Sequence, residues 1–96
     1  MEDIVYYSEL YDLYKNLLTD KQREYFEEYY FNNLSLSEIS SDFDISRNAV
    51  SKQLAVIREK LDEFELKLKL YSKKEKISNC ISDENLKDKI IDILLS

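Results

Sequence analysis

The 96-residue chain contains no glycine, proline, histidine or tryptophan, and one cysteine. The absence of glycine excludes phosphate-binding loops of the P-loop and G-x-G-x-x-G types, because their tight turns need backbone conformations that only glycine supplies. The absence of histidine, with a single thiol, excludes zinc fingers, thiol–imidazole catalysis and Ser-His-Asp triads. One cysteine cannot close an intrachain disulfide, which favours a reducing compartment.

Long apolar runs are also missing. The longest run is four residues, as from Ile4 to Tyr7, which is too short to cross a bilayer. The acidic first residues lack the basic segment of a signal peptide, so we expect a cytoplasmic protein. Tight β-turns depend on glycine and proline, whereas helices can be joined by Asn, Ser and Asp turns. The sequence therefore predicts an all-α fold in a single domain, residues 1–96.

Charge is distributed unevenly along the chain. Residues 1–45 carry 3 basic and 11 acidic side chains, residues 46–76 carry 9 basic and 5 acidic side chains, and the whole chain has a net charge of −6. This contrast suggests one basic face on an acidic molecule. The alternative is a set of solvated helix faces whose charges serve solubility.

Apolar spacing and capping residues predict the first three helices. A first helix is expected from about Asp3 to Leu18. Thr19 is typical of an N-cap, and Asn32 with Asn33 can end the second helix, since asparagine tolerates the left-handed conformation. Ser35 and Glu38 have the S-x-x-E spacing of a capping box, which predicts the start of a short third helix.

A seam of heptad spacing follows, formed by Val50, Leu54, Ile57, Leu61, Phe64, Leu68 and Tyr71. This seam predicts one long fourth helix, capped by Ser46 and continuing to about Lys74. A polar link at 75–82 and a C-terminal helix at about 83–95, capped by Ser82, complete the prediction. The tyrosines at helical spacing are interpreted as core residues, with base stacking as the alternative. Cys80, which lies in the predicted link, is interpreted as an inert thiol.

The segment 34–57 is the most informative part of the sequence. Apolar residues of the third helix can meet those of the fourth, with Ile45 filling the turn between them. Asp44 stands where glycine is usual, and aspartate is among the few residues that tolerate that backbone. The pattern predicts a helix–turn–helix at about residues 35–58, without a wing.

The start of the fourth helix supplies the candidate nucleic-acid site. With Val50 and Leu54 facing inward, the outward polar residues are Ser46, Arg47, Asn48, Ser51 and Lys52. Arginine can pair with guanine edges, asparagine with adenine and lysine with phosphate. The alternative is a helical pair that serves only as scaffold, and the net charge of −6 argues against tight binding to a polyanion. DNA and RNA both remain open as ligands.

A second candidate surface lies further along the seam. Phe64, Leu68 and Tyr71 extend beyond the helix–turn–helix core and need cover, which the first helix, a second protomer or a partner protein could supply. We therefore expect a homodimer. The second hypothesis is a protein-interaction module, whose surface would also include Leu66 and Leu70. An enzyme is not expected, nor is a metal or other cofactor, because the chain lacks histidine and a phosphate loop.

Several segments resemble a known family. LLTDKQREYFEEYYFNNLSLSEISSDFDISRNAVSKQLAVIREKL resembles the fourth conserved region of bacterial sigma factors. Residues 6–75 are more similar to the YlxM family of small helix–turn–helix proteins, through YDLYKNLLTDKQREYFEEYYF, LSLSEIS, ISRNAVS and the E-x-x-L-x-L-Y tail. The resemblance implies a cytoplasmic bacterial regulator, encoded beside signal recognition particle genes and acting through the RNA or the GTPase of that particle.

Overall fold

The computed structural model describes residues 3–80 and 83–95, and within them the chain is helical with no strand. The elements are α1 (Ile4–Tyr14), the 3₁₀ turn η1 (Lys15–Leu17), α2 (Asp20–Tyr30), α3 (Leu36–Phe43), α4 (Arg47–Leu68), α5 (Leu70–Cys80) and α6 (Glu84–Leu95). The all-α prediction is confirmed. Among the described residues, no helix combines the length and apolar character needed to cross a membrane.

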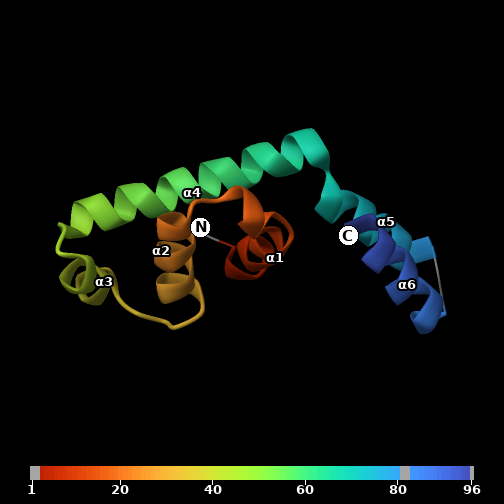
Figure 1. The fold of residues 1–96 in the computed structure, drawn as a ribbon, viewed down its shortest axis with the longest axis horizontal. Helices are drawn as coiled ribbons and strands as arrows, with labels where there is room; N and C mark the ends of the chain where they lie inside the picture. Colours follow the sequence, from red (N-terminus) through yellow and green to blue (C-terminus); the bar gives the residue numbers. More distant parts are fainter. Residues whose placement is uncertain (1–2, 81–82, 96) are drawn as a thin grey trace.

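Helix α4 is the central element of the fold, and each of the first three helices contacts it. Helices α1, α2 and α3 pack against it along one side, and α5 and α6 form a hairpin beyond its C-terminal end (Figure 1). The molecule is consequently elongated, with extents of 48 × 26 × 24 Å. Helices α5 and α6 contact each other, and neither has a buried residue. The core therefore lies where the first three helices meet α4.

Local capping residues start the helices as the sequence predicts. Thr19 and Ser35 each form a complete capping box, at the starts of α2 and α3. The Ser46 hydroxyl accepts a hydrogen bond from the backbone N–H of Ala49 at 3.1 Å and so caps α4. The predicted cap Ser82 lies outside the described residues, and the Asp83 carboxylate accepts backbone N–H groups at the start of α6.

The core is built mainly from aromatic and aliphatic side chains of α1, α2 and α4. The buried residues are Leu10, Tyr11, Tyr14, Leu18, Tyr25, Phe26, Ile39, Val50, Leu54, Ile57 and Leu61. The first four seam residues, Val50, Leu54, Ile57 and Leu61, are thus buried in the core. The remaining N-terminal tyrosines pack around it: Tyr6, Tyr7, Tyr29 and Tyr30. The interpretation of the tyrosine stripe as core is therefore confirmed for Tyr11, Tyr14 and Tyr25, whereas these four are only partly buried.

The long fourth helix is shorter than the heptad seam predicts. Helix α4 ends at Leu68 rather than near Lys74, because Lys69 adopts a left-handed conformation with φ 56° and ψ 33°. The polar link predicted at 75–82 is also wrong over residues 75–80, which belong to α5, while residues 81–82 lie outside the described part of the chain. The first helix likewise ends earlier than expected, since η1 replaces its last turn.

A polar network across three helices accounts for this break. The Glu65 carboxylate accepts hydrogen bonds from the backbone N–H groups of Tyr71 (3.0 Å) and Ser72 (3.2 Å), at the start of α5. The Tyr14 hydroxyl donates to the same carboxylate at 2.6 Å and accepts from the Leu70 N–H at 3.0 Å. Side chains of α1 and α4 therefore act as the N-cap of α5.

Helix α1 also covers part of the second half of the seam. The Phe64 ring lies 5.9 Å from the Tyr14 ring, and the Tyr71 ring meets the Tyr6 ring edge-on at 5.4 Å. Leu68, by contrast, is 45% exposed. The same chain thus supplies cover for two of the three predicted interface residues, and the homodimer stays a prediction.

Alkaline pH is expected to weaken the fold through the buried tyrosines. Burial and the hydrogen bond to Glu65 raise the pKa of Tyr14 to about 12, whereas an unfolded tyrosine loses its proton near pH 10. The stabilisation is complete below about pH 10 and is lost as the pH rises toward 12, by up to about 1 kcal/mol per pH unit. Urea unfolding of the wild type and of Tyr14→Phe across this range should show a shallower decline for the variant. Parallel declines would contradict this assignment.

Candidate nucleic-acid interface

The turn between α3 and α4 is fixed by backbone geometry. Asp44 has φ 53° and ψ 47°, the left-handed conformation that the sequence predicts at this position. The N–H of Ile45 donates to the Ser40 carbonyl at 3.0 Å, and the N–H of Asp44 reaches the Ser41 carbonyl at 3.4 Å. These bonds close the end of α3, so that the chain enters α4 in one defined direction.

Apolar contacts hold the two helices together behind this turn. Ile39 of α3 and Val50 and Leu54 of α4 are buried in one cluster. Phe43 packs against Tyr25 of α2, with ring centroids 4.6 Å apart. Because the inner side of α4 is buried in these contacts, only the outer side of its first turns is accessible to a ligand.

The five predicted site residues lie on that outer side. Ser46, Arg47, Asn48, Ser51 and Lys52 are all exposed. Four of them, with Leu36 of α3, line an open hollow of about 500 Å³, and Lys52 lies outside it. The structure therefore gathers four side chains around one concave surface at the start of α4, with the Lys52 cation beside them.

The electrostatics of this surface are mixed. The first turn of α4 contains no acidic residue, so its N-terminal N–H groups and the helix dipole favour an anion. Within the described residues, Arg47, Asn48 and Lys52 have no side-chain hydrogen bond or ion pair, so these donors are available to a ligand. The exposed carboxylates of Asp42 and Asp44 beside the turn act in the opposite direction.

Two further residues at this end of the molecule could not be anticipated from the sequence. Leu36 forms part of the wall of the hollow. Lys21 of α2 places its Nζ 4.3 Å from the centre of the Phe43 ring, near the end of α3. Neither residue carries a local signal, because only the tertiary fold brings α2 and the start of α3 next to the turn.

Within residues 3–80 and 83–95, no group of three or more cysteine or acidic side chains is arranged to hold a metal ion. Cys80 is exposed as a free thiol, and it lies in α5 rather than in a link. The chemistry available at the start of α4 is hydrogen bonding and charge pairing.

Comparisons with known proteins agree with this geometry. A family model described as "Putative helix-turn-helix protein, YlxM / p13 like" (UPF0122) matches residues 1–94. A UPF0122 protein of Malacoplasma penetrans is 40% identical over 93 residues, which cover 94% of this chain and 87% of the relative. A UPF0122 protein of Thermoanaerobacter sp. is 47% identical over 78 residues, with 81% and 67% covered. A third, from Mycoplasma capricolum, is 43% identical over 82 residues, with 85% and 73% covered.

Proposed function

The chain belongs to the UPF0122 family of YlxM-like helix–turn–helix proteins, and from this premise we propose that it binds nucleic acid through the first turns of α4. The observation that supports the proposal most directly is the hollow that gathers Ser46, Arg47, Asn48 and Ser51 beside Lys52. In a helix–turn–helix, the N-terminal residues of the second helix face the bases.

Each side chain has a distinct role in this proposal. Arg47 pairs with guanine edges and Asn48 with adenine, while Lys52 neutralises a phosphate. Ser46 and Ser51 donate hydroxyl hydrogen bonds to the backbone of the nucleic acid. The buried residues Val50 and Leu54 anchor α4 from behind, so the donors are presented on a rigid element.

Affinity is expected to be modest because the protein carries a net charge of −6. Binding to a polyanion draws mainly on phosphate neutralisation, and the site itself holds two cations, Arg47 and Lys52. We expect affinity to fall with salt along a shallow slope, equivalent to about two phosphates. A basic nucleic-acid-binding domain would show a steeper slope.

Alanine variants test the proposal. Lys52→Ala should weaken binding to all sequences alike, because a phosphate contact carries no sequence information. Arg47→Ala or Asn48→Ala should cost about 1–3 kcal/mol on a preferred sequence and less on others. Fluorescence anisotropy measures both effects when a duplex selected from a random-sequence pool is compared with the unselected pool, and RNA hairpins are titrated alongside. On an RNA hairpin, recognition depends on shape and backbone, and Asn48→Ala should then matter little.

Matched variants sharpen the measurement. Lys67→Ala removes an exposed lysine that pairs with Glu63 near the far end of α4, and it should leave affinity unchanged. Asp44→Asn removes a carboxylate beside the site while keeping a residue that tolerates the left-handed turn, and it should tighten binding. If the double variant Arg47→Ala, Lys52→Ala binds DNA and RNA as well as the wild type, the helix–turn–helix is scaffold and the proposal fails.

The YlxM resemblance implies a more specific role, as a cytoplasmic, non-enzymatic regulator in the signal recognition particle pathway. Its direct test uses signal recognition particle RNA as one of the titrated RNAs, with a scrambled hairpin of equal length as the control. Equal affinity for the two RNAs would contradict it.

A protein-interaction role is the second candidate, and the exposure of Leu66 (74%) and Leu68 (45%) near the end of α4 favours it. Leu70, which the sequence also suggested for this surface, packs against the core instead. Of the three residues predicted for a dimer interface, Phe64 and Tyr71 already contact rings of α1. A homodimer would therefore depend chiefly on Leu68 and its exposed neighbour Leu66.

A further inference from the structure

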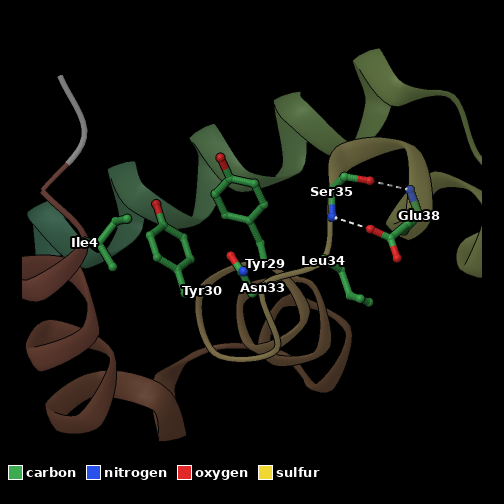
Figure 2. A pocket seen from close by; sticks show the side chains of 7 residues that line it. All are labelled: Ile4, Tyr29, Tyr30, Asn33, Leu34, Ser35 and Glu38. Atoms are coloured by element: carbon green, nitrogen blue, oxygen red, sulfur yellow. Dashed lines mark hydrogen bonds between the residues drawn. The ribbon is translucent and has the colours of Figure 1, made fainter.

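A second hollow, of about 370 Å³, lies away from the recognition surface, where the start of α1 meets the end of α2 and the loop into α3. Tyr29 and Tyr30 form its aromatic wall, and Ile4 and Leu34 add apolar surface (Figure 2). Open hollows with aromatic and apolar walls and a few polar groups are typical of binding sites. Neither the proposed nucleic-acid contact nor the core packing accounts for this one.

Contacts within the chain hold the two tyrosine rings of the aromatic wall in place without a ligand. Tyr30 stacks on Phe26 with ring centroids 4.2 Å apart, and its hydroxyl accepts a hydrogen bond from Arg58 at 3.1 Å. Tyr29 meets Tyr30 edge-on at 5.1 Å. The two rings are only partly buried, so rigid π-surface faces the hollow.

A carboxylate is held at the opposite end. In Figure 2, Glu38 lies at one end of the hollow and Ile4 at the other, with Tyr30 next to Ile4. Arg58 of α4 reaches the Tyr30 hydroxyl. Oε1 of Glu38 accepts the Ser35 N–H at 3.1 Å, as part of the capping box of α3. This bond positions the side chain, and Oε2 remains for a second hydrogen bond. The exposed amide of Asn33, which lies beside Tyr29 in Figure 2, adds a carbonyl acceptor to the lining of the hollow.

Charge decides between an anionic and a cationic ligand. The first 45 residues, which supply every residue that lines the hollow, carry 11 acidic and 3 basic side chains. Among the described residues that line the hollow, Glu38 is the one that carries a charge, and its carboxylate repels phosphate groups and attracts cations. Rigid aromatic rings favour a cation through their π-faces, and a carboxylate favours a guanidinium through paired charge-assisted hydrogen bonds.

The geometry points to a docking site for an arginine side chain carried by a positively charged peptide segment of a partner protein. The guanidinium pairs with Oε2 of Glu38, its plane lies against the Tyr29 ring, and an adjacent apolar residue of the peptide contacts Ile4 or Leu34. This site is separate from the proposed nucleic-acid contact and does not depend on it. Occupation of both would let the protein link a nucleic acid to a basic protein.

Glu38→Gln is the decisive variant, because glutamine at the third helical position also completes a capping box. It removes the charge at Glu38 and preserves the start of α3. Fluorescence anisotropy with a short fluorescein-labelled peptide of alternating arginine and leucine should show affinity falling about tenfold. Glu59→Gln removes one exposed carboxylate from α4 and should leave affinity unchanged. A peptide with neutral citrulline in place of arginine should bind no variant measurably.

The aromatic wall is tested in the same assay. Tyr29→Leu should lower affinity about threefold, whereas Tyr29→Phe retains the ring and should bind like the wild type. Circular dichroism verifies that each variant keeps its helix content. Three outcomes would overturn the proposal: unchanged affinity in Glu38→Gln, equal binding of the citrulline peptide, or tighter binding of a single-stranded RNA whose affinity falls in Tyr29→Leu.

Discussion

Phe26→Ala is expected to lower the free energy of unfolding by about 3–5 kcal/mol, because it empties the centre of the core. The Phe26 ring has no exposed surface, and it stacks between Tyr11 at 4.3 Å and Tyr30 at 4.2 Å. Truncation removes both stacking contacts and leaves a cavity that three helices cannot easily close. Urea unfolding followed by circular dichroism measures the loss.

Phe31→Ala is the matched control for this experiment. Phe31 also touches Tyr11 and Phe26, but only edge-on, and it is 49% exposed. Its loss should cost about 1 kcal/mol, since less apolar surface returns to water. If Phe26→Ala is unfolded without urea, Phe26→Leu gives a measurable intermediate value. Equal losses for Phe26→Ala and Phe31→Ala would show that the aromatic stack is not the centre of the core.

Glu65→Ala is expected to cost about 3 kcal/mol, because it leaves several partly buried donors unpaired at once. The Tyr14 hydroxyl and the N–H groups of Tyr71 and Ser72 all donate to this carboxylate. The start of α5 would lose its cap, and the attachment of the α5–α6 hairpin to the core would weaken. Urea unfolding is again the measurement.

Glu63→Ala provides the comparison two residues away on α4. Glu63 is exposed and pairs with Lys67, which lowers the pKa of the Glu63 carboxyl. Exposed pairs of this kind contribute little to stability, so Glu63→Ala should unfold almost like the wild type. A similar cost for Glu63→Ala and Glu65→Ala would mean that α5 is not held by the Glu65 network.

Local chemistry explains why much of the fold follows from the sequence. Capping residues act within four positions of themselves, so Thr19, Ser35 and Ser46 could be assigned from spacing alone, and the structure confirms all three. Asp44 belongs to the same class, because aspartate is one of the few residues that tolerate the left-handed turn found there. The helix–turn–helix is a product of such short-range rules.

The end of α4 could not be predicted from the sequence, because it depends on a contact between residues far apart in the chain. The heptad seam continues through Leu68 and Tyr71, and Lys69 carries no local signal of a turn. The break depends on Tyr14, 51 residues before Glu65 in sequence, whose hydroxyl completes the cap of α5. The hollow at Tyr29 and Glu38 could not be predicted either. Periodicity identifies an aromatic stripe as core, but it does not show which rings remain partly exposed.

The lack of buried residues in α5 and α6 means that the protein does not have one uniform stability. Backbone amides exchange with solvent through local openings, and each opening costs only the contacts that it breaks. Unfolding of the hairpin breaks its own contacts and those it makes with the core through Tyr6 and Tyr14, and leaves the cluster around Phe26 intact. We therefore expect two cooperative units of unequal stability, with amide hydrogen exchange faster in the α5–α6 hairpin than in the helix–turn–helix.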